Sequence, residues 1–226
     1  MSDHSGKIVV VTGAAGTLGR AATEYFANAG ATLALLDVAA IDGPHYARQC
    51  DLTDADACRE AVAAIATDVG PIDVLANIAG GFAMGEAVHE TSADTWRHMM
   101  DLNAHTVLNM ARAVVPGMLE RRSGRIVNVG APPGNHGVAQ LGAYSVSKGA
   151  VIRLTEAMAA ELREQGINVN CVLPTIIDTP PNREAMPDAD FDKWVKPEAL
   201  AKVIGFLASS DADPIHGAAL PVSGLS

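Results

Sequence analysis

Two patterns of apolar residues alternate along the chain. Short runs rich in β-branched residues are typical of buried strands, and longer segments with apolar residues every three or four positions are typical of helices. The first pattern predicts strands at residues 7–12, 32–36, 46–50, 72–77, 125–129, 167–173 and 219–222, of which 46–50 is the weakest. The second predicts helices at residues 18–28, 54–69, 92–120, 142–164 and 197–208. Residues 92–120 form either one long helix, bent near its end by Pro116, or two consecutive helices.

The alternation of strands and helices predicts the fold class. A helix between two strands is the crossover that a parallel sheet requires, so we expect an α/β protein whose parallel sheet has helices on both faces. The 226 residues suit a single domain spanning residues 1–226. Ligands of such sheets bind beyond the carboxyl ends of the strands. The Pro-rich segment at residues 174–196 follows such an end and is long for a structureless connection, so residues 178–196 are a candidate substrate lid.

Composition narrows the possible partners. Apolar residues make up 49% of the chain and charged residues 19%, and the formal net charge is -10. This acidic balance disfavours nucleic acids and anionic membrane surfaces, and no apolar run is long enough to span a membrane. The three cysteines, Cys50, Cys58 and Cys171, are far apart and form no CxxC pair. We therefore expect buried, reduced thiols, no metal site and a cytoplasmic protein.

A glycine-rich segment follows the first predicted strand and opens the first predicted helix. Its residues are Gly13, Ala15, Gly16, Thr17, Leu18 and Gly19. Glycines at this place let the backbone turn sharply and approach a pyrophosphate, which then lies at the helix N-terminus. The position between strand and helix makes a dinucleotide site a stronger interpretation than a simple turn.

Asp37 ends the second predicted strand. A carboxylate there accepts hydrogen bonds from an adenosine ribose and repels a 2′-phosphate, so we expect NAD rather than NADP. Asp51 and Leu52 end the third strand and are candidates for the adenine edge. Asn77, Ala79 and Gly80 end the fourth and are candidates for the cofactor ribose. Both sets are equally consistent with turn residues.

Tyr144 and Lys148 are four residues apart on a predicted helix and share a face. A free phenol has a pKa of about 10, and a nearby ammonium lowers it, so such a pair can serve as general acid or base.

Five features follow one another along the chain: the glycine loop, Asp37, the Asn77–Gly80 turn, Asn103 and the Tyr144–Lys148 pair. In their order and spacing the chain resembles the short-chain dehydrogenase/reductase family over essentially its whole length. The resemblance implies a Rossmann-type doubly wound sheet, a nicotinamide cofactor and hydride transfer to or from a small substrate. It implies that Tyr144 exchanges the proton, that Lys148 holds the nicotinamide ribose and that Asn103 holds a water for proton relay. It places Pro174, Ile177 and Thr179 near the nicotinamide, and it implies a homodimer or homotetramer built through residues 92–120 and 142–164.

Two positions depart from the family pattern: Ala131 replaces the usual serine, and the loop is spaced GxxGxxG with Thr17 where a glycine is common. At both positions the chain resembles the quinonoid dihydropteridine reductase branch of the family. The AGGF turn and the DTPPNR and MPDADFDKW segments match that branch as well. This resemblance places Phe82, Asn182 and Trp194 beside the substrate. Hydride delivery to a conjugated C=N system gives a delocalised charge, which needs less from a single hydroxyl donor.

Alternatives remain open. A ketone or alcohol dehydrogenase, or a 3-oxoacyl reductase, needs another donor in place of the serine. Asn135, His136 and Gln140 are candidates, and His136 is preferred because an imidazole donates hydrogen bonds and titrates near neutral pH. A non-catalytic dinucleotide-binding sensor is the alternative from another class.

Overall fold

The computed structural model describes residues 2–225 and contains one seven-stranded sheet. All neighbouring strands are parallel, in the order β3-β2-β1-β4-β5-β6-β7. The strands are β1 (Ile8–Thr12), β2 (Thr32–Asp37), β3 (Tyr46–Gln49), β4 (Val74–Asn77), β5 (Gly124–Val129), β6 (Ile167–Pro174) and β7 (Ala219–Val222). The order reverses between β1 and β4, which is the switch point where such sheets bind ligands.

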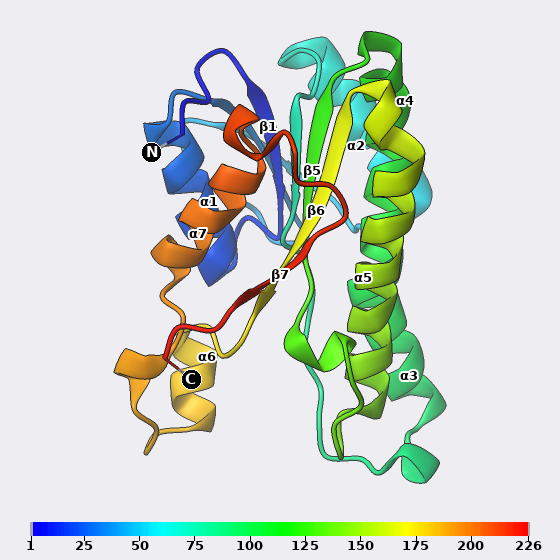
Figure 1. Cartoon of the computed structure of the whole chain (residues 1–226), viewed down its shortest axis with the longest axis vertical. Coiled ribbons are helices and arrows are strands. Elements are labelled where there is room, and N and C mark those ends of the chain that lie inside the picture. The colour runs from blue at the N-terminus through cyan, green and yellow to red at the C-terminus, as the bar shows by residue number, and fades with distance from the viewer. Residues whose placement is uncertain (1, 226) are drawn as a thin grey trace.

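The helices lie on both faces of the sheet, which confirms the predicted doubly wound fold. Helices α1 (Thr17–Asn28) and α7 (Pro197–Leu207) cover one face (Figure 1). Helices α2 (Ala55–Asp68), α4 (Thr106–Arg121) and α5 (Gly142–Leu162) cover the other. Two shorter helices, α3 (Ala93–Met100) and α6 (Pro180–Ala185), extend below the sheet on opposite sides of the molecule.

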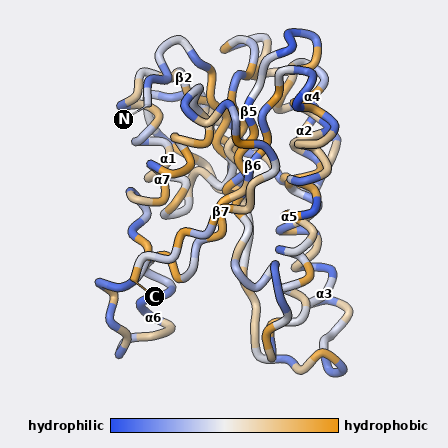
Figure 2. Tube along the Cα trace, viewed as in Figure 1, coloured by the Kyte–Doolittle hydropathy of each residue, from blue (hydrophilic) through white to orange (hydrophobic). Residues whose placement is uncertain are grey.

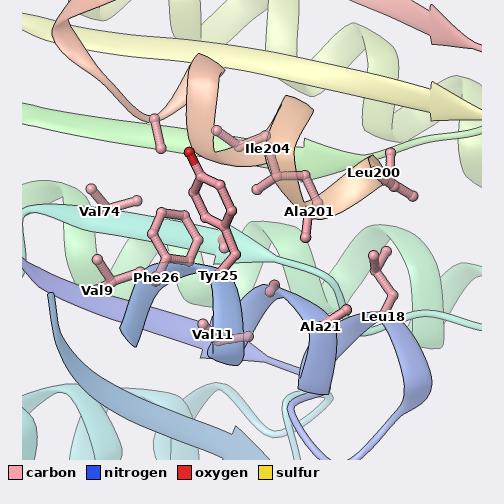
Figure 3. Packing of buried hydrophobic residues seen from close by; sticks show 14 of the residues in the cluster. Val9, Val11, Leu18, Ala21, Tyr25, Phe26, Val74, Leu200, Ala201 and Ile204 are labelled. Carbon is pink, nitrogen blue, oxygen red and sulfur yellow. The ribbon is translucent and has the colours of Figure 1, made fainter. Parts of the chain in front are cut away.

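Both faces of β1 are buried, which explains its unbroken apolar sequence. Val9 and Val11 pack into the cluster under α1 and α7, beside Phe26 and Ile204 (Figure 3). Val10 packs into the cluster on the opposite face. The same division holds across the sheet, and hydrophobic residues concentrate along the central strands (Figure 2). The alternation of side chains along a strand therefore supplies both cores.

The structure decides between the two arrangements left open for residues 92–120, and it differs from expectation in the predicted lid. Residues 92–120 form two consecutive helices, α3 and α4, joined by a π-helical turn, η2 (Asp101–His105), and Pro116 lies inside α4. The predicted lid is not structureless, because it contains α6 and the 3₁₀ turn η5 (Phe191–Lys193). A side-chain cap explains α6, since the Thr179 hydroxyl accepts a hydrogen bond from the Asn182 N–H.

The three cysteines are buried free thiols, as predicted. Within residues 2–225, no helix is both long enough and apolar enough to cross a bilayer.

Candidate active site

The glycine loop is too tightly packed to carry side chains at its glycines. Gly13 has φ +64°, and a Cβ there would lie 2.8 Å from the Cα of Ala79. A Cβ on Gly19 would lie 2.7 Å from the Cα of Ala14. Helix α1 starts after Gly16 with no side-chain cap, so the N–H groups of its first turn remain for an anion. This cradle fits a dinucleotide pyrophosphate. Leu18 is 7% exposed and belongs to the core, so only its backbone is suited to the predicted cofactor contact.

Asp37 is attached directly to this loop. Its Oδ2 accepts a hydrogen bond of 3.0 Å from the N–H of Ala15, and its Oδ1 accepts one of 2.9 Å from Ala39. The structure therefore places a carboxylate within hydrogen-bond distance of the loop backbone, at the end of β2. A carboxylate at the end of the second strand fits the predicted contact with an adenosine ribose.

The remaining predicted adenosine and ribose residues make structural contacts. The Asp51 carboxylate accepts hydrogen bonds from the N–H and hydroxyl of Thr53, and these bonds lower its pKa. Leu52 is buried, and its carbonyl accepts a hydrogen bond from Asn109. The Asn77 side chain donates 2.9 Å to the Asn128 Oδ1 inside the core. The side chain of Asn77 is thus occupied within the protein, and only its backbone is suited to line the ribose.

The turn after β4 is held against the end of β1. The Thr12 hydroxyl accepts hydrogen bonds from the N–H groups of Ile78 and Ala79. A Cβ on Gly80 would lie 2.8 Å from the Asn103 Oδ1 and 3.1 Å from the Lys148 Nζ. The structure therefore brings Gly80, Asn103 and Lys148 together, although they come from three separate elements.

Lys148 is buried, with 5% of its surface exposed, and its Nζ donates a hydrogen bond of 2.9 Å to the Val129 carbonyl. Burial disfavours the ammonium and lowers the pKa of Lys148 to about 8. An ammonium has three N–H donors, so two remain for other acceptors such as ribose hydroxyls.

Tyr144 lies one turn before Lys148 on α5. Its ring meets the ring of Phe82 edge to face, with 5.0 Å between centroids. Burial raises the pKa of Tyr144 to about 12. This differs from the expectation that Lys148 lowers the pKa, because desolvation of the phenolate dominates and the Lys148 ammonium bonds to the Val129 carbonyl. Phe82, predicted to face the substrate, remains 59% exposed beside Tyr144.

Asn103 sits in the π-helical turn, where its side chain bonds to Gly81 and Ser147. Its Oδ1 accepts from the Gly81 N–H, and its Nδ2 donates to the Gly81 carbonyl and to the Ser147 hydroxyl. For a proton-relay water, the second lone pair of the Oδ1 and the backbone remain as partners. Sequence reasoning missed Ser147, whose hydroxyl also donates to the Tyr144 carbonyl. Its place in the turn between Tyr144 and Lys148 was the available signal.

The position of the family serine carries a buried methyl group. Ala131 is 4% exposed, follows the end of β5 and precedes the 3₁₀ turn η3 (Pro132–Gly134). The candidate replacement donors, Asn135, His136 and Gln140, all lie exposed on the loop that follows. Gln140 adopts φ +62°, and its carbonyl accepts a hydrogen bond from Gly85.

A cavity of about 100 Å³ lies where this loop approaches the segment after β4. Its lining includes Glu86, Thr95 and Gln140, and it reaches Ala143, the residue before Tyr144. Polar and apolar side chains, Met84 and Leu141 among them, therefore surround a small space next to the candidate catalytic turn.

The lid segment is held together by its own side chains. The Asp178 carboxylate accepts 2.8 Å hydrogen bonds from Arg183 and from Lys196. The Arg183 guanidinium stacks 4.7 Å from the ring centroid of Phe191, which packs against Trp194. Trp194 is 5% exposed, so it belongs to the interior of the lid rather than to a substrate surface, contrary to the prediction.

The residues predicted near the nicotinamide also hold this segment. The Asn182 side chain, predicted to bind substrate, donates a hydrogen bond of 2.8 Å to the carbonyl of Ile177. Ile177 forms a bridge with Val195, and Pro174 ends β6 in register with Val222. The lid motif is thus explained by internal contacts.

Comparison with known families decides the identity of the fold. A family model described as short chain dehydrogenase matches residues 7–190. The chain belongs to this family. It is therefore an oxidoreductase that binds a nicotinamide dinucleotide, NAD or NADP, and acts on a small molecule.

Relatives within the family match nearly end to end. The chain is 31% identical to 3-oxoacyl-acyl-carrier-protein reductase FabG of Thermotoga maritima, covering 97% of each chain. It is 35% identical to meso-2,3-butanediol dehydrogenase of Serratia marcescens, covering 96% of this chain and 93% of the relative. It is also 35% identical to inactive 2-(S)-hydroxypropyl-CoM dehydrogenase 2 of Xanthobacter autotrophicus, covering 87% and 95%.

A solved structure supports the same family assignment. The aldohexose dehydrogenase of Thermoplasma acidophilum superposes with a TM-score of 0.88 at 29% identity, covering 98% of this chain and 94% of that one. These similarities establish the short-chain dehydrogenase family, and a special relation to the dihydropteridine reductase branch stays a hypothesis.

Proposed function

We propose that this short-chain dehydrogenase uses NAD(H) to move a hydride between the nicotinamide and a small substrate with a C=O or C=N bond. The observation that carries the proposal is the convergence of Lys148 and Asn103 on Gly80, with Tyr144 one turn earlier on α5. The bound cofactor supplies or accepts the hydride.

Tyr144 is the proton donor in the reductive direction. With a pKa of about 12 it is protonated at neutral pH, so it carries the proton that the substrate atom takes up as it gains charge. The oxidative direction requires the same group to accept the proton. Lys148, with two N–H donors beyond its bond to Val129, holds the ribose of the cofactor.

The preference for NAD rests on Asp37. Its carboxylate is fixed against the glycine loop by the N–H of Ala15, so it cannot turn away from a 2′-phosphate without losing that bond. Repulsion between the two anions supports NAD over NADP.

Ala131 bears on the class of substrate. A buried methyl group cannot donate a hydrogen bond to a localised alkoxide, which supports an acceptor whose developing charge is delocalised. Quinonoid dihydropterin is such an acceptor. A ketone or alcohol is the second candidate. It is supported by the relatives named butanediol dehydrogenase and 3-oxoacyl reductase, and by Glu86, Thr95 and Gln140 in the lining of the cavity beside Ala143.

NADH oxidation, followed by absorbance, tests the proposal. Quinonoid dihydropterin, a small diketone and a 3-oxoacyl thioester serve as acceptors, each with a no-enzyme control and with Tyr144→Phe as the matched variant. Turnover that requires the Tyr144 hydroxyl supports an oxidoreductase, and the preferred acceptor decides between C=N and C=O. Binding of NADH without turnover on any acceptor would instead support the non-catalytic sensor.

We also propose a homodimer or homotetramer. Large apolar side chains remain exposed on α3, α4 and α5, including Trp96, Leu108 and Val146. Burial of these side chains against a second copy would remove apolar surface from water. Light scattering of the purified protein gives the mass, and a monomer would contradict the proposal.

A further inference from the structure

We infer that Thr155, two helical turns beyond Lys148, is a positioning residue that sets Tyr144 and Lys148 in place through Asn128. The inference rests on the proposed function above, because it assigns a role in that reaction to a residue outside the site.

Thr155 belongs to a buried chain of side-chain hydrogen bonds across three elements. Its hydroxyl donates 2.8 Å to the Val151 carbonyl within α5 and accepts 2.9 Å from the Asn128 Nδ2 of β5. The Asn128 Oδ1 accepts 2.9 Å from the Asn77 Nδ2 of β4. Thr155, Asn128 and Asn77 are each at most 3% exposed. The direction of every bond is fixed, because each amide or hydroxyl has a defined donor and acceptor in the chain.

This chain attaches α5 to the strand that also receives Lys148. Asn128 and Val129 are consecutive in β5; the first bonds to Thr155, and the carbonyl of the second accepts from Lys148. Thr155 and Lys148 are seven residues apart, so they lie on one face of α5 about 10 Å apart along its axis. Two bonds to adjacent residues of one strand therefore fix how far α5 slides and turns relative to β5.

A second hydroxyl on α5 acts in the same way on a different neighbour. Ser147 donates to the Tyr144 carbonyl and accepts from Asn103, which ties the first turns of α5 to the π-helical turn η2. That bond does not connect α5 to β5. Without Thr155, the bond of the Lys148 ammonium to Val129 would be the remaining side-chain hydrogen bond between α5 and β5 among the described residues, and that ammonium is also assigned to the cofactor.

A purely structural role is the competing explanation. A buried Asn needs hydrogen-bond partners. Thr155 would accept a hydrogen bond from Asn128 even if α5 carried no catalytic residues. The two explanations differ in what a lost bond does to the folded enzyme. A structural role changes stability alone, whereas a positioning role changes the surroundings of Lys148 and the rate of the chemical step.

The test compares Thr155→Val, which keeps the shape and removes the hydroxyl, with Thr155→Ser, which keeps the hydroxyl. Thr155→Ala, which also removes the hydroxyl, takes the place of Thr155→Val if the latter does not fold. The first readout is the pKa of Lys148, measured by NMR on protein with labelled lysine, and it needs no turnover. We expect Thr155→Val to raise this pKa from about 8 toward the ordinary lysine value as water reaches the ammonium, and Thr155→Ser to leave it unchanged.

The second readout is kinetic, on whichever acceptor the wild-type protein reduces. We expect kcat to fall about tenfold or more in Thr155→Val with the KM for NADH within about twofold, and to recover in Thr155→Ser. An unchanged Lys148 pKa and an unchanged kcat in the folded variant, whatever its melting temperature, would overturn the inference. Absence of wild-type turnover would count against the proposed function alone, since the pKa readout still decides the role of Thr155.

Discussion

The ε-amino group of Lys148 lies 2.9 Å from the backbone carbonyl oxygen of Val129 and donates a hydrogen bond to it. This bond holds a cationic group in the interior, where loss of hydration lowers its pKa to about 8. One carbonyl dipole offsets only part of that loss. Lys148 therefore destabilises the fold at the place where the proposed reaction needs it.

The free energy of unfolding should reveal this cost through its pH dependence. A lysine in the unfolded chain has a pKa of about 10.4. Below pH 8 both states carry the proton and the full cost is present, about 3 kcal/mol. Between about pH 8 and 10 the unfolded chain binds more protons than the folded one, so this contribution makes stability rise with pH.

Lys148→Met, which lacks the charge, supplies the comparison. Urea unfolding at several pH values should show the variant more stable than the wild type near pH 7, with the difference shrinking toward pH 10. A difference independent of pH would show that Lys148 is not desolvated as described. Above pH 10 Tyr144 acts in the opposite direction, since its raised pKa keeps its proton only in the folded state.

Tyr144→Phe removes the proposed proton donor and keeps the ring against Phe82. We expect kcat to fall by about 10²–10⁴-fold, the usual worth of a general acid, with the dissociation constant for NADH nearly unchanged. Steady-state kinetics and NADH fluorescence titration give the two values. Undiminished turnover would remove Tyr144 from the mechanism.

Asp37→Asn keeps a side-chain acceptor for the N–H of Ala15 and removes the charge. We expect the ratio of kcat/KM for NADPH to that for NADH to rise about tenfold, which corresponds to about 1.4 kcal/mol of relieved repulsion. Asp42→Asn removes the same charge from a nearby exposed position and serves as the control. An equal change in both variants would point to net charge rather than to Asp37.

Gly80→Ala should damage the site without disturbing the distant core. The added methyl would lie 2.8 Å from the Asn103 Oδ1 and 3.1 Å from the Lys148 Nζ, so one of these side chains has to move. We expect kcat/KM to fall at least tenfold. Gly137→Ala is the matched control, since a Cβ there meets nothing within 4 Å. Wild-type kinetics in Gly80→Ala would show that the three residues are less closely packed than described.

Asp178→Asn should loosen the lid. The guanidinium of Arg183 and the ammonium of Lys196 hold the pKa of Asp178 well below its usual range, so both ion pairs persist in mildly acidic solution. The neutral variant loses both, and we expect faster trypsin cleavage after Arg183 and a raised KM for the substrate. Asp188→Asn, at an exposed lid position, is the control. Identical cleavage rates in the two variants would argue that the ion pairs of Asp178 do not hold the lid in place.

Local sequence accounts for the elements because each follows from short-range pattern. The run from Ile8 to Thr12 is apolar at successive positions, which only a strand buried on both faces explains. Asp54 caps α2 through the N–H groups of Asp56 and Ala57, a contact readable within three residues. Family resemblance added Asn103 and the roles of Tyr144 and Lys148, which no local pattern contains.

The lid shows where pattern was insufficient. The motif in residues 178–196 was interpreted as a cover for the substrate, with Asn182 and Trp194 beside it. The structure makes it a set of internal contacts with Trp194 buried. Identical residues serve either purpose, and only the direction of the side chains distinguishes them.

The sequence by itself determined the strands, the longer helices that flank the sheet, the glycine loop and the family, because period, capping and turn chemistry act over a few residues. Only the tertiary structure decided the ionisation of Lys148 and Tyr144, the hydrogen bonds of Asn103 to Gly81 and Ser147, and the chain from Asn77 through Asn128 to Thr155. These depend on burial and on hydrogen bonds between residues far apart in the chain, since the fold alone sets which groups lose water and which partners replace it.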